Sequence, residues 1–363
     1  MPRFVFAALV LSLLIGFAAS PASATAPGQN GKLAFVSDRG GNNDIYIMNP
    51  DGSGQTNITS HSANDGAPAW SPDGSKIAFA SNRAGNFEVY LMNLDGSEVT
   101  RLTNNPAGDS PRAWSPDGTK IAISTNRDDN FEVYVIDADG GNPTNVSNNP
   151  AFDSRPAWSP DGTKLAFRSD RDGNLEIYTA NIDGSGQTRL TNNPAFDADP
   201  SWSPDGTKIA FESDRDGDFE VWVMNANGSA PVQLTENTAF FDSTPVWSPD
   251  GTKIAFESTR DGNEEVYVMS ADGTGQTNLS DSMATDEEVD WQPVPDSGGA
   301  GDVDCNGIVN AVDAALVLQY QAGLLAGLPC LAKANVNGDG SVNSVDAVLI
   351  LQFIAGLLPT LPP

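Results

Sequence analysis

Short apolar runs recur along most of the chain, and turn residues separate them. One run begins with a lysine and reads Lys-Ile-Ala-Phe or a close variant, with copies starting at Lys32, Lys76, Lys120, Lys164, Lys208 and Lys253. A second run with alternating side chains follows each copy after a turn rich in Asp, Gly and Asn, as at residues 88–92 and 265–269. A third ends in Leu-Thr or a close relative. These patterns predict short β-strands, of which the first is buried on both faces.

Tryptophans give the pattern a fixed period. Successive members are 44, 44, 44, 45 and 44 residues apart, at Trp70, Trp114, Trp158, Trp202, Trp247 and Trp291. Five of the six precede Ser-Pro-Asp-Gly, in which Pro and Gly favour a tight turn. Four short antiparallel strands per period, repeated six times, predict an all-β six-bladed propeller.

The two ends of the repeat are complementary. The first copy, at Lys32, has no tryptophan before it, whereas Trp291 is followed by Gln-Pro-Val in place of the turn. We therefore expect residues 289–291 to supply the innermost strand of the blade whose other strands come from residues 32–60. That pairing leaves no open sheet edge.

The repeated phrases Trp-Ser-Pro-Asp-Gly, Lys-Ile-Ala-Phe and Glu-Val-Tyr, across residues 31–293, resemble the TolB-type propeller family. This family also includes propellers that precede the α/β-hydrolase domain of serine peptidases. The Gly-x-Ser-x-Gly nucleophile motif of that domain does not occur in this sequence, which argues against a peptidase.

Charge and histidine content narrow the functional classes. The 363 residues include 48 acidic and 19 basic side chains, a formal charge of −29, which argues against binding to nucleic acid. The sequence has one histidine, His61, which we interpret as solvated, so catalysis that needs a Ser-His relay or a His-rich metal site lacks its parts.

Two acidic positions recur in the repeats. An aspartate stands five residues before every tryptophan, at Asp65, Asp109, Asp153, Asp197, Asp242 and Asp286. Ring geometry predicts that these carboxylates face the channel mouth, where they bind a cation or a cationic ligand; alternatively, each one bonds to backbone N–H groups of its own loop. An arginine followed five residues later by an acid, as in Arg83 and Glu88, predicts a cross-strand ion pair.

The N-terminus predicts export. Arg3, an apolar run over residues 4–19 and Ala22-Ser23-Ala24 fit a signal peptide over residues 1–24, and no later stretch reaches the ~20 apolar residues of a membrane span. Residues 25–293 then form the propeller of an extracellular, cell-surface or periplasmic protein. In such an oxidising compartment, Cys305 and Cys330 are expected to form a disulfide.

A linker over residues 294–301 leads to a small domain over residues 302–363. Two segments 33 residues apart have oxygen ligands at loop positions 1, 3, 5, 9 and 12, Gly at position 6 and a backbone carbonyl at position 7. They predict two Ca²⁺ sites, the first with Asp302, Asp304, Asn306, Ile308, Asn310 and Asp313, the second with Asn335, Asn337, Asp339, Ser341, Asn343 and Asp346. Each loop is followed by one expected helix, over residues 314–323 and 347–356.

This duplicated loop and helix, with Asp at position 12, resembles a type I dockerin over residues 302–361. The resemblance implies calcium-dependent attachment to a cohesin-like scaffold protein. It also implies that loop positions 10 and 11 contact that partner, here Ala311, Val312, Ser344 and Val345, which depart from the Ser-Thr pair of cellulosomal dockerins. The alternative is a calcium-stabilised module without a partner.

Together these features predict an exported, non-enzymatic binding protein. Its propeller recognises a protein, a peptide or a glycan, and its C-terminal module attaches it to a scaffold. The alternatives are a glycoside hydrolase or lyase within a polysaccharide-degrading assembly, and a structural spacer. Six nearly identical loops argue against the enzyme, because a catalytic site breaks repeat symmetry.

Overall fold

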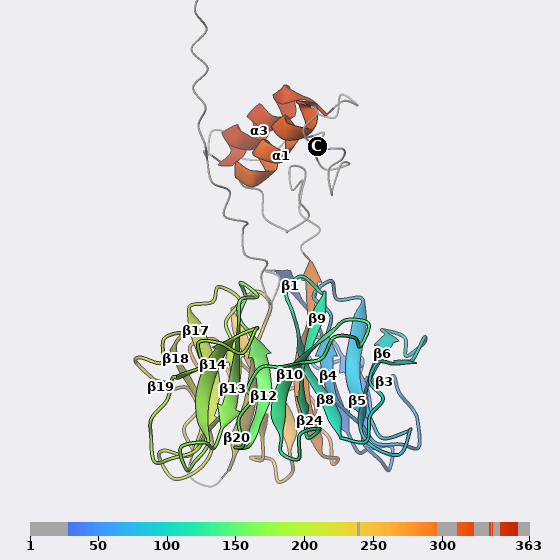
Figure 1. Ribbon diagram of the computed structural model, residues 1–363, viewed down its shortest axis with the longest axis vertical. Coiled ribbons are helices and arrows are strands. Elements are labelled where there is room, and N and C mark those ends of the chain that lie inside the picture. Colours follow the sequence, from blue (N-terminus) through green and yellow to red (C-terminus); the bar gives the residue numbers. More distant parts are fainter. Residues whose placement is uncertain are drawn as a thin grey trace, which may run out of the picture.

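The computed structural model describes residues 28–237, 240–295, 311–322, 334, 336 and 342–354. Within these residues, 24 strands form six four-stranded antiparallel sheets, which surround one axis as a disc (Figure 1). The predicted six-bladed propeller is therefore confirmed. Two helices follow, α1 (Ala311–Gln321) and α3 (Ser344–Ile354).

Each blade has four strands, which we order from the innermost, at the channel, to the outermost. The innermost strands are β24 (Asp286–Pro295), β4 (Asp65–Trp70), β8 (Asp109–Trp114), β12 (Asp153–Trp158), β16 (Asp197–Trp202) and β20 (Asp242–Trp247). The second strands are β1 (Gly28–Ser37), β5 (Lys76–Ser81), β9 (Lys120–Thr125), β13 (Lys164–Ser169), β17 (Lys208–Ser213) and β21 (Lys253–Ser258). In this order they define blades 1 to 6.

The two outer strands complete each sheet. The third strands are β2 (Asp44–Met48), β6 (Glu88–Asn93), β10 (Glu132–Asp137), β14 (Glu176–Asn181), β18 (Glu220–Asn225) and β22 (Glu265–Ser270). The outermost strands have two residues each: β3 (Thr56–Asn57), β7 (Thr100–Arg101), β11 (Thr144–Asn145), β15 (Thr188–Arg189), β19 (Val232–Gln233) and β23 (Thr277–Asn278).

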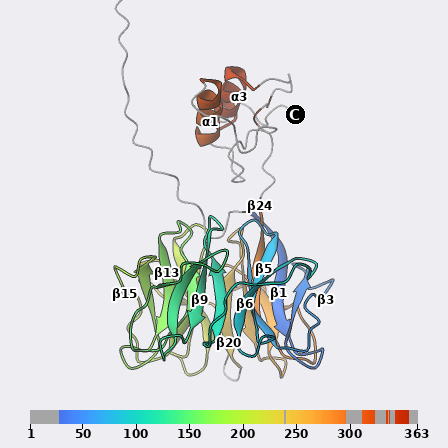
Figure 2. The same cartoon turned by 45° about the vertical axis from the view of Figure 1, so that its right-hand side comes forward.

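Blade 1 closes the ring as the sequence predicts. Strand β24 pairs antiparallel with β1, with Trp291 opposite Leu33, and the sheet order is β24-β1-β2-β3. Because the last strand of the propeller completes the first blade, that blade has no unpaired inner edge (Figure 2). Separating the termini of the propeller therefore requires breaking a strand pair.

The core lies between neighbouring blades. Trp70 of blade 2 packs with Ala34 and Ile45 of blade 1 and with Phe79 of its own blade. The turn after Trp70 is held by Ser71, whose hydroxyl donates a 2.6 Å hydrogen bond to Asp73. Gly74 closes this turn with φ of 67°, and a Cβ there would lie 2.3 Å from the carbonyl oxygen of Pro293 in blade 1. The repeated motif thus shapes both the turn and the contact between blades.

Both helices begin three residues earlier than the sequence predicts and end two residues earlier. At α3 the cause is an N-terminal cap: the backbone N–H of Asn343 donates to Asp346 at 2.8 Å, and Val345 N–H donates to the Asn343 side chain at 2.8 Å. The helices bury Val317 and Ile350 against each other. No helix in the described ranges is long and apolar enough to cross a membrane.

Candidate binding site in the propeller channel

The inner strands carry a bulge that turns one side chain toward the channel. The third residue of five of them has positive φ: Ala67 50°, Arg155 57°, Asp199 49°, Thr244 45° and Glu288 53°. The ladder to the second strand shifts register there, as between Ser154 and Ala157. Bulges commonly redirect side chains at functional sites, and non-glycine residues in this region of φ are strained. In β8 the position is Pro111, whose ring excludes positive φ, and Arg112 follows it.

These residues surround a cavity of about 180 Å³ on the propeller axis. Its lining combines the six repeated tryptophans with side chains that differ from blade to blade. The charged members of the lining are Arg112, Arg155, Asp199, Glu288 and Asp290. The channel is therefore apolar where the blades are alike and charged where they differ.

A network of ion pairs joins the blades across this cavity. Arg112 Nη1 lies 3.0 Å from Glu288 Oε1, and Arg168 Nη1 lies 3.0 Å from Asp199 Oδ1. Arg155 lies between the two carboxylates, 3.6 Å from Asp199 and 3.7 Å from Glu288. Its guanidinium forms no hydrogen bond with the residues that the structure describes, so its donors are available to a ligand.

Each of three bulges is supported by a side chain on the second strand of the preceding blade. The backbone N–H of Thr244 donates to Glu212 at 3.1 Å, and that of Glu288 donates to Glu257 at 2.5 Å. Arg155 N–H donates to Ser124 in the same way, at 3.1 Å. A bulge frees a backbone N–H from the ladder, and these contacts satisfy it. The channel side chains are thus held in place before any ligand arrives.

Burial gives these carboxyl groups different protonation states. Burial, assisted by the charge of Asp199, raises the pKa of Glu212 to about 8. Burial also raises the pKa of Glu257 to about 7 and that of Asp290 to about 7. Burial acts in the same direction on Glu288, but Arg112 and Arg155 outweigh it and lower its pKa to about 2. At neutral pH, Glu288 is a carboxylate, whereas Glu212 is protonated.

The six aspartates of the repeat lie elsewhere. Each is fully or almost fully buried and forms an ion pair with an arginine, and none lines the channel cavity. We call these the rim pairs: Asp286–Arg39 at 2.6 Å, Asp65–Arg83 at 2.9 Å, Asp109–Arg127 at 3.1 Å, Asp153–Arg171 at 3.0 Å, Asp197–Arg215 at 2.7 Å and Asp242–Arg260 at 2.7 Å. A ligand or cation role for these aspartates stays a prediction.

The predicted pairing of each arginine with the acid five residues later is wrong. Arg83 instead reaches back across the rings of Phe79 and Tyr90, 5.2 and 4.9 Å from their centroids, to Asp65. Glu88 accepts hydrogen bonds from Thr103 and the Asn105 backbone, and so holds the loop after the outermost strand. The acid is therefore occupied by its own loop and not by the arginine.

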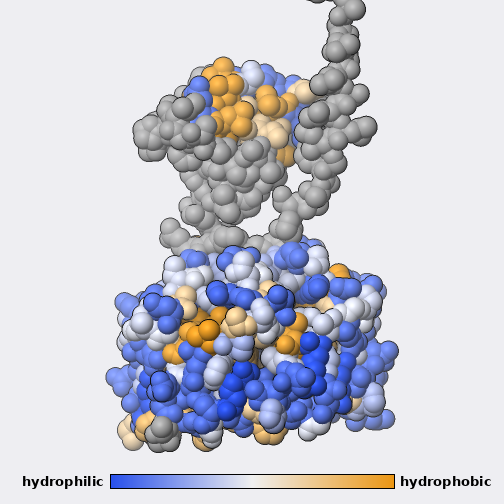
Figure 3. Space-filling model, turned by 90° about the vertical axis from the view of Figure 1, so that its left-hand side faces the viewer, coloured by the Kyte–Doolittle hydropathy of each residue, from blue (hydrophilic) through white to orange (hydrophobic). Residues whose placement is uncertain are grey.

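Other predicted sites lie partly or wholly outside the described residues. These are the signal peptide, Cys305, Cys330 and the calcium-loop residues Asp302, Asp304, Asn306, Ile308, Asn310, Asn335, Asn337, Asp339 and Ser341, together with the side chains of Ala311, Val312 and Asp313. Ser344 is exposed, and so is Val345, at 52% of its surface. Val348 and Leu351 are exposed nearby on α3, and apolar atoms gather on this helical unit in Figure 3.

The channel residues were not predicted from the sequence, because the predictions rested on positions that are alike in all repeats, whereas the channel residues differ between repeats. One position after the repeated Lys-Ile-Ala-Phe run varies widely, while its neighbours change only to Ile123 and Thr125 in blade 3. The variable residues are Val36, Ala80, Ser124, Arg168, Glu212 and Glu257. The third position of the inner strands varies in the same way. These variations are the signal that could have located the site.

The fold and the channel define a class: a closed six-bladed propeller with a preorganised, charged axial cavity. Residues 103–191 and 156–243 match the TolB beta propeller domain, and residues 29–132 match the tricorn protease N-terminal beta propeller domain. Residues 300–355 match the dockerin type I domain. Residues 103–243 thus match TolB-type propeller domains within a six-bladed propeller, and a dockerin type I match follows, a combination that suggests protein binding and scaffold attachment.

Solved structures agree with this assignment. TolB from Acinetobacter baumannii is 28% identical, with a TM-score of 0.65 over 72% of this chain and 67% of that one. A protein assigned as TolB from Agrobacterium tumefaciens is 25% identical, with a TM-score of 0.57 over 73% and 99%. The tricorn protease, 17% identical with a TM-score of 0.54 over 69% and 26%, shares the fold. No curated protein matches the chain.

Proposed function

We propose that this chain is an exported, non-enzymatic binding protein. Its propeller channel receives a narrow segment of a protein, peptide or glycan partner, and its C-terminal module attaches the chain to a cohesin-type scaffold in the presence of Ca²⁺. The observation that supports the first part best is Arg155. It lines the cavity between two carboxylates, and its guanidinium forms no hydrogen bond with the residues that the structure describes. Such a group favours a ligand that carries a carboxylate or another oxygen-rich group.

The size of the cavity limits what can enter. A volume of about 180 Å³ accommodates a side chain, a chain end or part of a sugar ring, but no folded domain. The bulged strands are fixed by hydrogen bonds from neighbouring blades, so binding requires little reordering of the site. We therefore expect recognition of an extended segment with an acidic group.

Peptide selection tests this part. A random peptide library displayed on phage is selected against the full mature chain, and selected peptides are remeasured on Arg155→Ala. We expect at least a tenfold loss of affinity, because the channel cation is removed. Lys208→Ala, which removes an exposed cation elsewhere on the disc, is the matched control. Peptides that bind both variants like the wild type would contradict the channel assignment.

Attachment is tested separately with a panel of type I cohesins. The full chain is expected to be retained in Ca²⁺ and released by EDTA. Exposed Val345, Val348 and Leu351 offer an apolar surface on α3 for this contact. In calorimetry, EDTA should also abolish the transition of the C-terminal module. Retention of no cohesin, or a calcium-independent transition, argues for a module without this role.

Carboxyl groups in and beside the channel keep one second candidate open, a polysaccharide-active enzyme. Glu212 and Glu257 have pKa values of about 8 and about 7, while that of Glu288 is about 2, so an acid and a base share one region. Incubation with acidic and neutral polysaccharides would release new chain ends under this hypothesis, and Glu288→Gln would stop it. Intact polysaccharide favours the binding protein.

A further inference from the structure

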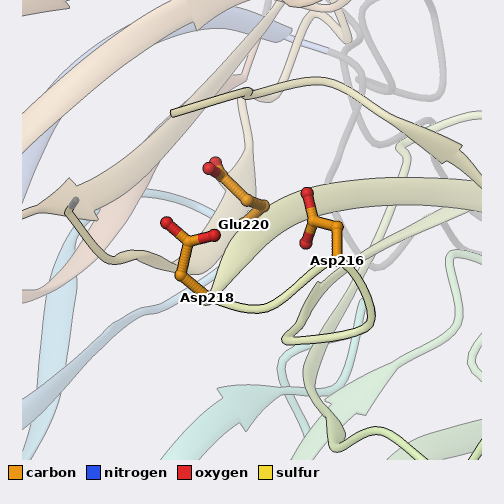
Figure 4. Close-up of side chains that lie close together, drawn as sticks. All are labelled: Asp216, Asp218 and Glu220. Carbon is orange, nitrogen blue, oxygen red and sulfur yellow. The ribbon is translucent and has the colours of Figure 1, made fainter. Parts of the chain in front are cut away.

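The hairpin between β17 and β18 in blade 5 brings three carboxylates together. Asp216, Asp218 and Glu220 each place a carboxylate oxygen within 4.8 Å of the others (Figure 4). Asp216 is exposed, Asp218 is half-buried and Glu220 is fully buried, so the cluster extends from the surface into the sheet. An acidic cluster alone is common on an acidic protein, and the other blades show why this one differs.

In the other five blades the position of Asp218 is an asparagine. There the amide, as in Asn86, donates to the acid of the third strand and to two carbonyl groups of the following loop: Asn86 Nδ2 lies 3.1 Å from Glu88 Oε1 and 2.9 Å from the Asn105 carbonyl oxygen. Asn130, Asn174 and Asn263 make the same contacts. Blade 5 thus has a carboxylate acceptor where the other blades have an amide that donates to the acid.

A second donor is also missing from this hairpin. In blades 3, 4 and 6 a tyrosine hydroxyl bonds the acid equivalent to Asp216, in the pairs Tyr134–Asp128, Tyr178–Asp172 and Tyr267–Asp261. Blade 5 has Trp222 instead, and its indole N–H has no hydrogen-bond partner among the described residues. The Gln233 amide is the donor that remains on Asp216. Blade 5 therefore lacks two of the hydrogen-bond donors that other blades have at this place.

Two buried oxygens at or beside the cluster lack partners in the described part of the chain. Oδ2 of Asp218 is buried, and within the described residues it accepts no hydrogen bond. The same holds for Oδ1 of Asp242, a side chain with no exposed surface that adjoins the cluster through Asn237: the Asn237 amide donates to Asp242 at 3.2 Å, and its backbone N–H donates to Glu220 at 2.7 Å. Burial, the charge of Asp242 and that of Asp218 raise the pKa of Glu220 to about 7.

We propose that Asp216, Asp218 and Glu220 bind a divalent cation, Ca²⁺ in an extracellular setting, with Asp242 as the buried carboxylate behind them. The ion occupies the carboxylate oxygens that the neutral asparagine amide and tyrosine hydroxyl bond as donors in other blades. Hard cations prefer such all-oxygen sites, which offer neither nitrogen nor sulfur ligands. This site is separate from the predicted calcium loops and from the channel, and the affinity expected is ~10⁻⁴–10⁻³ M, as in extracellular modules.

Calcium stoichiometry on the full chain tests the proposal. Asp218→Asn restores the residue of the other five blades and should fold, which circular dichroism checks. It is expected to bind one Ca²⁺ fewer than the wild type in equilibrium dialysis, whatever number the C-terminal module binds. Asp172→Asn, the same charge change at the Asp216 position of blade 4, is expected to leave the number unchanged. Equal stoichiometry of the wild type and Asp218→Asn overturns the proposal.

Terbium provides a second readout that locates the ion. Tb³⁺ substitutes for Ca²⁺ and luminesces when an excited indole lies nearby, and Trp222 is part of this hairpin region, whereas residues 302–363 contain no tryptophan. Excitation of tryptophan should give Tb³⁺ emission in the wild type and at least a fivefold weaker emission in Asp218→Asn and Trp222→Tyr. Emission that is unchanged in both variants contradicts a site at this hairpin.

Discussion

The rim pairs and the ion pairs of the channel both join arginines to carboxylates of the inner strands, but they differ in repetition and in bonding. Each rim pair joins a buried aspartate to one arginine at 2.6–3.1 Å, and all six blades have it. In the channel, Arg155 is shared by two carboxylates at 3.6 and 3.7 Å, and no two blades contribute the same set. In this propeller, the repeated charges join strands within each blade, and the charges that break the repeat mark places available for a ligand.

Removal of a rim arginine should have the largest effect. Arg83→Ala leaves Asp65 buried without its charge partner and also removes the stacking on Tyr90. Breaking a buried ion pair from one side costs about 3–5 kcal/mol. We expect the free energy of unfolding to fall by about that amount, measured by urea denaturation. A loss below about 1 kcal/mol would show that the rim pairs are not structural.

Protonated Glu212, which supports the bulge at Thr244, should produce a pH effect of intermediate size. The pKa of Glu212 in the folded chain is about 8, above the 4.5 of an unperturbed Glu, so the folded state binds more protons than the unfolded state between these values. The free energy of unfolding therefore falls as pH rises from about 4.5 to about 8. Glu212→Gln keeps an acceptor for the Thr244 N–H without this titration. At pH 8 the variant should be more stable by at least about 1 kcal/mol.

The comparison of denaturation curves at pH 4.5 and pH 8 checks this expectation. The wild type and Glu212→Gln should be similar at the lower pH and separate at the higher one. Parallel pH profiles would mean that Glu212 is ionised in the folded protein.

An exposed ion pair provides the smallest effect and a reference for the other two. Lys120 lies 2.6 Å from Asp137, with 39% and 28% of the two side chains exposed. Solvent-exposed pairs of this kind contribute about 0.2–1 kcal/mol. Lys120→Ala should therefore lower the free energy of unfolding by no more than about 1 kcal/mol in the same denaturation assay. A loss as large as that of Arg83→Ala would remove the distinction between buried and exposed pairs.

The propeller fold could be predicted from the sequence because it depends on residues that recur in every blade. The period of the six tryptophans predicted the number of blades, and the missing turn after Trp291 predicted the closure through β24 and β1. The arginine pairing was wrong because sequence spacing does not show that Arg83 folds back over two aromatic rings to the inner strand. The backbone conformation at Pro111 and its five counterparts likewise becomes visible only in three dimensions.

The channel site was not predictable by motif because its members come from different blades. Arg155 and Glu288 are far apart in sequence and meet only when the ring closes. The variable position that holds Glu212 and Glu257 can be found by aligning the repeats. Its role cannot be predicted in this way, because the residues that surround it come from other blades. The blade 5 hairpin was easier to predict from the sequence, since Asp218 and Trp222 each differ from the residue that all other blades have at that position.

One paired measurement tests the division between structural and ligand-binding charges most directly. Urea denaturation and affinity for a channel-selected peptide are measured on Arg83→Ala and Arg155→Ala of the full chain. The account predicts that Arg83→Ala loses about 3–5 kcal/mol of stability while its folded fraction keeps wild-type affinity. Arg155→Ala should lose at least tenfold in affinity, about 1.4 kcal/mol, with a smaller change in stability. The account would be contradicted if Arg83→Ala lost affinity and Arg155→Ala lost stability, or if both variants lost stability and affinity equally.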